Sequence, residues 1–571
     1  MNDFKNIVAS DLLLCLNCIS SEIQLSAKEI SDMFEYPPDP SLGDIAFPCF
    51  RLSKILRKSP VMIAQEISSR LKSDVISEAR AVNGYLNIFA SDDYLIKSVL
   101  YEIEDKKEKY GSDGSGVGKV AVFDYSSPNI AKPFHIGHLG TTVIGHSLKM
   151  LHQFQGYKCI GINYLGDWGT QFGKLIVAYD LWGDEKTVEE RGVDELVDLY
   201  VRFHAEAEKD DTLNERARHE FSKLEHHDER NTKLWKWFVD ISLKEYKKTY
   251  VQLGIEFDSY KGESFYTDKM PEQIEKLRQL GLLKIDNGAS IVDLSKYNMP
   301  PCLILKKDGS TLYPTRDIAA AVYRKKTYNF DKCVYVTSAG QSLHFAQWFK
   351  VVELMGYDWY NQLVHVPYGT VSINGEKLAT RTGNVILLKD LFATAIDKVK
   401  DIINEKSPDL ENKDEVAEAV GVGSVVFYYL YNNRIKDINF VMEDALSFEG
   451  NTGPYAQYTY ARTCALLEKA KNIDAMATEP KITAPEESEL LKVLSRFGEA
   501  VKEAVREYEP SIVTRYIIEV CSSFNKFYHN CPIISESDEV ARNTRIRLTA
   551  ATRTVLGSAF GLICIKKTER I

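Results

Sequence analysis

From residue 119 onward, short apolar runs that predict strands alternate with stretches of helical apolar spacing. This alternation is typical of a parallel, doubly wound α/β sheet, which binds ligands at the carboxyl ends of its strands. The predicted strands are 120–123, 159–164, 334–337 and 363–366. We therefore expect functional residues directly after these runs.

The two ends of the chain have different patterns. Residues 1–110 mix an amphipathic helical stretch with short strand-like runs, which predicts an α+β domain. Beyond about residue 390 the apolar residues keep a spacing of three to four, which predicts an all-helical region. The expected domains are 1–110, 114–390 with a charged helical insertion at about 183–262, and 391–571 with a helical bundle over about 450–571.

Composition places the chain among ordinary globular proteins. It has 571 residues, of which 44% are hydrophobic and 27% charged, and a net charge of −10, so a nucleic acid would have to meet local basic patches. Ten scattered cysteines indicate a reducing compartment, and Cys15 and Cys18 read as core thiols; we predict no metal site. No apolar run approaches the ~20 residues that span a bilayer, so we expect a cytoplasmic protein without a membrane partner.

The segment 127–138, Ser-Pro-Asn-Ile-Ala-Lys-Pro-Phe-His-Ile-Gly-His, follows the first predicted strand and precedes a predicted helix. Such a turn favours a phosphate, because free N–H groups and the positive end of the helix dipole point into it. We expect His135 and His138 to lie in the first helical turn and to face one ligand. Gly137 allows a nucleotide to approach closely, and Lys132 adds positive charge. Two histidines that merely cap a packed helix are the alternative interpretation.

Four separated blocks resemble one family, in the family's order. Segment 127–138 resembles the HIGH signature of class I aminoacyl-tRNA synthetases, in the extended form of the arginyl-tRNA synthetases; the other blocks are 163–175, 312–317 and the C-terminal third. The resemblance implies a Rossmann-like, HUP-type catalytic domain with an N-terminal additional domain and a C-terminal anticodon-binding bundle. It also implies an arginine–tRNA ligase that uses ATP with Mg²⁺, L-arginine and tRNA(Arg).

For ATP, the resemblance implies a cradle that stabilises charge at the α-phosphate. Segment 377–384 takes the place of the KMSKS loop, but Thr380 replaces its second lysine, and Lys132 is implied as the substitute for that charge. A polar hairpin is the alternative for this segment. The implied catalytic residues are Lys132, His135, His138, Lys377 and Arg381, and the implied ATP-binding residues are His135, Gly137, His138, Lys377, Thr380 and Arg381.

A guanidinium group needs a carboxylate, preferably with a hydroxyl or aromatic partner. Tyr313 and Asp317 lie four apart, so they converge on one ligand if a helix begins at Pro314. Alternatively, Asp317 caps a helix and Tyr313 packs in the core. The resemblance implies that the arginine-binding residues are Asp124, Ser127, Asn129, His138, Tyr313, Asp317 and Gln341.

The helical third of the chain combines aromatic and basic residues suited to stacking bases and meeting phosphates. Family resemblance places this region, with the basic run of Arg542, Arg545 and Arg547, against the tRNA, and the N-terminal domain near the tRNA elbow. We expect the chain to act as a monomer. The expected tRNA-binding residues are Asn451, Tyr455, Gln457, Tyr458, Arg462, Phe527 and Tyr528.

Two other functions fit parts of this pattern. A different adenylyl-transferring enzyme with a His-x-Gly-His turn would share the ATP half, but should lack the acidic guanidinium pocket and the helical C-terminal third. A non-catalytic, tRNA-binding paralogue is conceivable because the lysine loop is altered.

Overall fold

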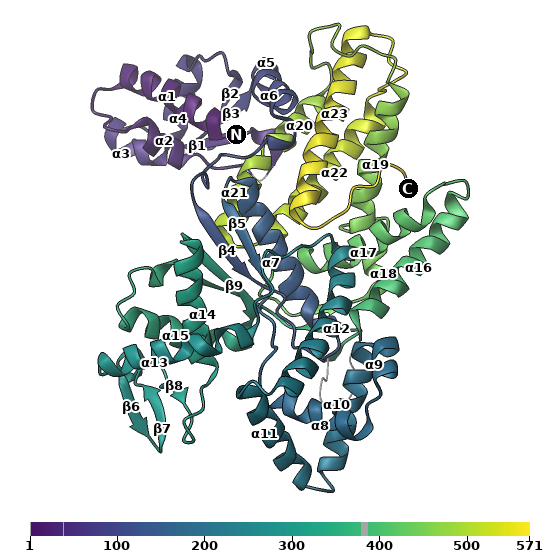
Figure 1. Cartoon of the computed structure of the whole chain (residues 1–571). Coiled ribbons are helices and arrows are strands. Elements are labelled where there is room, and N and C mark those ends of the chain that lie inside the picture. The colour runs from purple at the N-terminus through teal and green to yellow at the C-terminus, as the bar shows by residue number, and fades with distance from the viewer. Residues whose placement is uncertain (1, 38, 378–385) are drawn as a thin grey trace.

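A four-stranded parallel sheet forms the centre of the molecule in the computed structural model, which describes residues 2–37, 39–377 and 386–571 (Figure 1). Its order is β10-β9-β4-β5, so the chain order reverses between β4 and β9, where such sheets bind ligands. The four predicted strands are confirmed: β4 (Val120–Asp124), β5 (Lys158–Ile162), β9 (Lys332–Ser338) and β10 (Leu363–Tyr368).

Helices cover both faces of this sheet, because its strands are apolar on both sides. α7, which follows the predicted phosphate turn, buries residues along nearly its whole length. The helices of the sheet region are α7 (Gly137–Phe154), α8 (Thr170–Trp182), α14 (Tyr313–Tyr328) and α15 (Ser342–Leu354), with the short turn η7 (Ala339–Gln341) before α15.

The predicted insertion is helical. It consists of α9 (Glu185–Arg191), α10 (Val193–Ala207), α11 (Thr212–Glu225) and α12 (Glu229–Leu253). α12 is the longest of the four. Its two ends explain its bounds: the Asp228 side chain accepts a hydrogen bond from Asn231 N–H, and Gly254 in the left-handed region ends the helix.

Two small sheets were not predicted. Residues 263–305 contain η5 (Glu263–Lys269), α13 (Met270–Gln279) and an antiparallel sheet of β6 (Leu283–Asp286), β7 (Ala289–Val292) and β8 (Cys302–Leu305). The second sheet joins β11 (Val371–Ile373), β12 (Glu376–Lys377) and β13 (Ile438–Phe440). Because β13 pairs in parallel with β11, the prediction that everything beyond about residue 390 is helical is wrong there. A three-residue strand is too short to leave a periodic signal.

The N-terminal domain has the expected α+β composition. Its antiparallel sheet has the order β1-β3-β2; α4 packs against β2 and β3, and α1 packs against α2 and α4. The elements are α1 (Asn2–Ile19), α2 (Ala27–Met33), β1 (Ile45–Pro48), α3 (Ser53–Leu56), α4 (Pro60–Arg70), β2 (Ile76–Val82), β3 (Tyr85–Ala90), α5 (Asp92–Leu95) and α6 (Tyr101–Lys106). Cys18 is exposed and Cys15 partly so, so the interpretation of this pair as core thiols is wrong for Cys18.

The C-terminal region is a helical bundle that lies beside the N-terminal domain (Figure 1). In the described part of the chain, no helix is both long and apolar enough to cross a membrane. The helices are α16 (Leu388–Lys406), α17 (Lys413–Tyr431), α18 (Met442–Ala445), α19 (Gly453–Lys469), α20 (Pro485–Leu494), α21 (Phe497–Glu507), α22 (Ser511–Asn530) and α23 (Glu539–Leu562).

Candidate active site

The turn between β4 and α7 has an unusual backbone. Ser126, Ser127 and Ala131 have φ values of 70°, 47° and 56°, which residues other than glycine rarely adopt. Such conformations persist only where surrounding contacts enforce them, and they cluster at functional sites. One such contact comes from Gly166, whose backbone pairs with that of Asn129; a Cβ there would lie 2.1 Å from Asn129 Oδ1. The geometry of the turn therefore depends on Gly166, which belongs to the second block of the sequence, 163–175.

The histidines of this turn differ from the prediction in one respect. α7 begins at Gly137, so His135 precedes the helix rather than lying in its first turn. The two rings are nevertheless adjacent, with centroids 4.0 Å apart. The N–H groups expected to be free are used internally: Gly137 N–H donates to His135 Nδ1 (3.1 Å), and His135 N–H donates to His138 Nδ1 (3.2 Å).

These two hydrogen bonds fix the tautomer of both rings. Since each Nδ1 accepts a proton donor, each neutral imidazole carries its proton on Nε2. Burial lowers the pKa of His138 to about 3, with a further contribution from His135. Burial, and then Lys132, lowers the pKa of His135. At neutral pH the turn therefore offers imidazole Nε2–H donors in place of the expected backbone N–H groups.

Segment 377–384, which takes the place of the KMSKS loop, lies between a hairpin and a stretch of chain that pairs with the phosphate turn. An Asn374-Gly375 hairpin turn, with both residues at positive φ, leads into β12. Further along, Ile136 N–H donates to Ile386 O (3.2 Å), and Leu388 N–H donates to Phe134 O (2.9 Å). Two segments about 250 positions apart thus meet at the phosphate turn. Thr380 and Arg381 lie outside the described residues, as does the side chain of Lys377.

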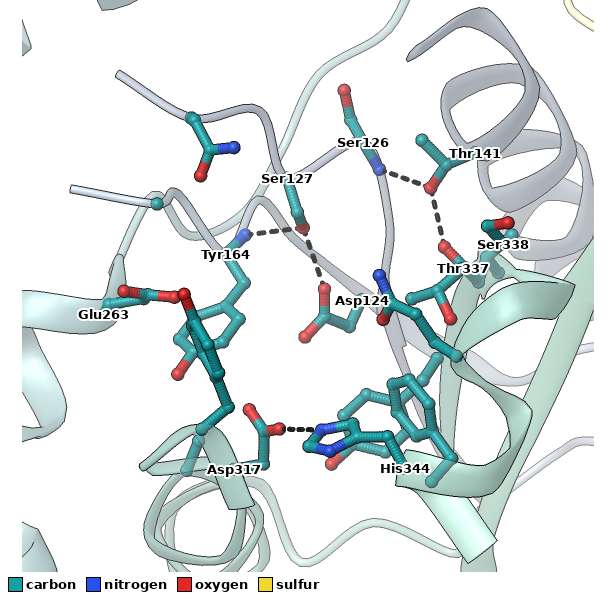
Figure 2. A pocket seen from close by; sticks show the side chains of 18 of the residues that line it. Asp124, Ser126, Ser127, Thr141, Tyr164, Glu263, Asp317, Thr337, Ser338 and His344 are labelled. Carbon is teal, nitrogen blue, oxygen red and sulfur yellow. Dashed lines mark hydrogen bonds and ion pairs between the residues drawn. The ribbon is translucent and has the colours of Figure 1, made fainter. Parts of the chain in front are cut away.

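A pocket of about 500 Å³ opens at the carboxyl ends of β4 and β9 (Figure 2). Its residues come from the phosphate turn, the end of β5, α14 and the β9–α15 turn. All seven side chains predicted to bind arginine line it: Asp124, Ser127, Asn129, His138, Tyr313, Asp317 and Gln341. His135 and Lys132 are not among its lining residues.

Three carboxylates face the pocket from different elements: Asp124, Glu263 and Asp317 (Figure 2). α14 begins at Tyr313, one residue before the predicted start, so Tyr313 and Asp317 do share a helical face. Tyr313 is 67% exposed, which excludes the alternative that it packs in the core. Asp317 Oδ2 and His344 Nε2 form a hydrogen bond at 2.7 Å, and Asp317 caps no helix.

Glu263 was not predicted from the sequence. Its side chain is mostly buried and lies 2.6 Å from Arg316 Nη1. Burial raises the pKa of Glu263 to about 7, while Arg316 opposes the rise. Glu263 is the first residue of η5 and follows the insertion. Because neither a strand nor a motif precedes it, the sequence carries no local signal for its role.

Asp124 is already paired inside the protein. Arg324, which is completely buried, places Nη1 2.8 Å from Asp124 Oδ2, and Ser127 Oγ donates to Asp124 Oδ1 at 3.0 Å. Burial raises the pKa of Asp124, and Arg324 and Ser127 oppose that rise. The Arg324 guanidinium also lies over the rings of Tyr164 and Tyr335, at 5.1 and 5.4 Å. Asp124 therefore lines the pocket as half of an ion pair.

On the C-terminal bundle, three of the predicted tRNA-binding residues form one aromatic platform: Tyr458, Arg462 and Tyr528. The Arg462 guanidinium lies 4.9 Å from the ring centroids of both tyrosines, and its Nη1 donates a hydrogen bond to Asn525 Oδ1. Asn525 also donates to Tyr455 Oη at 2.9 Å. Both platform tyrosines are more than one-third exposed, as a stacking surface requires. Asn451 is exposed just before α19.

Other predicted tRNA contacts are corrected by burial. Gln457 and Phe527 are completely buried, and Gln457 donates to the carbonyls of Ala419 and Lys566, so neither side chain reaches an RNA. Arg545 binds Glu487 and Glu536, and Arg547 binds Glu104 of the N-terminal domain. These arginines hold the protein together instead of forming a basic surface.

Comparison with known proteins decides the family. Residues 99–442, more than half of the chain, match the model described as "tRNA synthetases class I (R), catalytic domain". The chain belongs to the arginyl-tRNA synthetases. Residues 12–90 match the arginyl-tRNA synthetase N-terminal domain, and residues 456–571 match the DALR anticodon binding domain.

Relatives of this synthetase agree over its full length. It is 48% identical to the arginine–tRNA ligases of Alkaliphilus metalliredigens and Clostridioides difficile, with 100% of each chain covered in both comparisons. The arginyl-tRNA synthetase structure from Thermus thermophilus has the same fold, with a TM-score of 0.80 at 24% identity, covering 98% of this chain and 99% of that one. This synthetase is thus a class I arginine–tRNA ligase, and ATP is its substrate.

Proposed function

We propose that the pocket at the ends of β4 and β9 holds L-arginine with its guanidinium group toward Asp317 and Glu263. Glu263 comes from η5 and Asp317 from α14, so the two carboxylates can accept hydrogen bonds from different N–H groups of one planar guanidinium. Tyr313, at the exposed rim, supplies a hydroxyl to the same group. This arrangement of two acids around one opening is the single observation that carries the proposal.

The α-amino and carboxylate groups would lie at the phosphate turn. Asn129, Ser127 and Gln341 line that part of the pocket with neutral polar groups. Asp124, neutralised by Arg324, offers its carboxylate to the ammonium group without adding an unpaired buried charge. This places the arginine carboxylate beside His138.

In the first step a carboxylate oxygen of arginine attacks the α-phosphorus of ATP, and pyrophosphate leaves. The Nε2–H groups of His135 and His138 would donate to the phosphate oxygens as charge builds up there. Lys132, exposed on the same turn, would supply the cation that Thr380 does not. We assign Lys377 and Arg381 to the pyrophosphate side and Gly137 to the close approach of the nucleotide.

Mg²⁺ fits this site as part of the nucleotide. The described residues contain no cluster of three metal-binding side chains, and the pocket carboxylates are oriented toward a guanidinium or already paired. Mg²⁺ is commonly bound through substrate phosphates, and when bound it would neutralise their charge.

In the second step the 2′-hydroxyl of the terminal tRNA adenosine attacks the arginyl carbonyl carbon, and AMP leaves. The platform of Tyr458, Arg462 and Tyr528 would stack bases of the anticodon loop, and Asn451 and Tyr455 would contact the same RNA. We further propose domains at 1–110, 114–390 and 391–571, with the first near the tRNA elbow. One chain carries both pocket and platform, which supports a monomer, and ten free cysteines support a cytoplasmic location.

Arginine-dependent pyrophosphate exchange tests this proposal. Exchange should require arginine and should be negligible with lysine or citrulline, because the neutral ureido group of citrulline cannot balance the charge of the pocket carboxylates. The assay is run with and without tRNA(Arg), and aminoacylation is measured in parallel. Exchange supported equally by citrulline would contradict the assignment of the acidic pocket.

A further inference from the structure

One face of α12, the longest helix of the insertion, forms hydrogen bonds with the phosphate turn. Ser242, Tyr246 and Tyr250 follow one another at intervals of four and therefore share a face. All three are buried. Ser242 Oγ accepts a hydrogen bond from Ala131 N–H (3.1 Å), and Tyr250 Oη shares one with Ser126 Oγ (2.7 Å). Both contacts fall on residues whose φ is positive.

Tyr246 makes the central contact. Its hydroxyl lies 2.7 Å from Asn129 O and 2.7 Å from Lys132 O, so it donates into the gap between two carbonyls of the turn. One proton thus serves both carbonyls and fixes the separation of residues 129 and 132. Lys132 follows directly after Ala131, whose conformation is strained.

The same face also supports His138. The ring of Phe134 packs on Tyr246 and Tyr250, with centroids 5.4 and 5.6 Å away. Phe134 also stacks on His138, with ring centroids 5.1 Å apart and an interplanar angle of 15°. A shift of α12 would therefore move both the backbone of Lys132 and the ring of His138.

We propose that Tyr246 is a positioning residue for adenylate formation, acting from the insertion through its hydrogen bonds to the carbonyls of Asn129 and Lys132. The inference rests on the proposed role of Lys132 in neutralising the phosphates. Tyr246 touches no substrate in this scheme. It holds a non-glycine turn in the conformation that presents the Lys132 ammonium group.

The test is a double-mutant cycle of Tyr246→Phe and Lys132→Ala, read by tRNA-dependent pyrophosphate exchange with arginine. Tyr246→Phe should lower kcat about tenfold or more with the KM for arginine unchanged, since a misplacement of about 1 Å can cost about a hundredfold. In the Lys132→Ala background the same change should cost less than about twofold, because the positioned group is gone.

Tyr516→Phe is the matched control. Tyr516 is also a buried tyrosine, and its hydroxyl lies 3.2 and 3.3 Å from two carbonyls, Val493 O and Leu494 O, but inside the C-terminal bundle. Its loss should lower the Tm about as much as Tyr246→Phe while leaving kcat within about twofold of the parent. Should Tyr246→Phe fail to fold, Ser242→Ala replaces it with the same expected non-additivity.

The outcomes separate the two proposals. Full kcat in Tyr246→Phe, or an equal loss in both backgrounds, overturns the role of Tyr246 alone. Unchanged exchange in Lys132→Ala overturns the role of Lys132 in the proposed mechanism, and the inference falls with it.

Discussion

The arginine pocket and the aromatic platform hold their charged groups in opposite ways. In the pocket each carboxylate already has a partner before any substrate binds: Arg324 for Asp124, Arg316 for Glu263 and His344 for Asp317. On the platform Arg462 lies between two half-exposed rings and one amide. Removing one partner in the pocket leaves a buried charge, whereas the platform can rearrange in water. Substitutions should therefore be costly in the pocket and mild on the platform.

Asp317→Asn should have the largest effect and tests the pocket side of this comparison. The amide cannot balance the guanidinium charge, so kcat/KM for arginine should fall about 10⁴-fold while ATP binding is retained. Pyrophosphate exchange measures the first quantity and nucleotide titration the second. A variant with near-normal kcat/KM would remove Asp317 from the recognition of the guanidinium.

Arg324→Met should be the most destabilising change, because it leaves Asp124 buried and unpaired. Breaking a buried ion pair in this way costs about 3 to 5 kcal/mol, measured as the free energy of unfolding in denaturant. The double variant Asp124→Asn/Arg324→Met should recover much of this stability, but not the affinity for arginine. If the single variant were as stable as the parent, Asp124 would not need Arg324 as a partner in the folded protein.

Glu263 should make arginine binding depend on pH. Its pKa is raised to about 7, so the carboxylate is progressively protonated as the pH falls from 8 to 6, and the KM for arginine should rise, approaching tenfold per pH unit below 7. Stability runs the other way: the raised pKa favours the folded state below the ordinary value of 4.5, and this contribution is lost as the pH rises through 7.

The control for the pH effect is Glu263→Gln, which should have a weaker but pH-independent KM for arginine between pH 6 and 8. His138 should add no inflection there, since its pKa is about 3. A parent enzyme with a flat KM over this range would show that Glu263 stays charged in the free pocket.

Tyr458→Leu should have the smallest effect and tests the platform side. Stacking of one base on an aromatic side chain contributes at least about 1 kcal/mol of binding free energy. Its loss should raise the KM for tRNA about fivefold and leave the KM for arginine unchanged. Aminoacylation at varied tRNA measures this. A thousandfold rise in the KM for tRNA would contradict the comparison, because the platform would then be as sensitive to substitution as the pocket.

The two regions also differ in how far the sequence predicted them. The pocket residues follow strand ends, and parallel strands end at one edge, so Asp124 and Gln341 could be placed together from the strand pattern and the family motifs. On α19 the prediction includes residues of the motif regardless of the helical face on which they lie. Positions 455, 458 and 462 share one helical face, while 457 points to the opposite side and is buried. Helical periodicity applied to the motif would have excluded Gln457.

The sequence by itself determined the α/β class, the helical bundle and the chemistry of the two motifs, because periodicity and local turn signals are written along the chain. Only the tertiary structure decided which charges are paired. Arg324, Glu263 and Tyr246 carry no motif, and their partners lie from 53 to 200 positions away. Such pairing follows from burial, where an unpaired polar group is costly, and burial is a property of the packed molecule rather than of any segment.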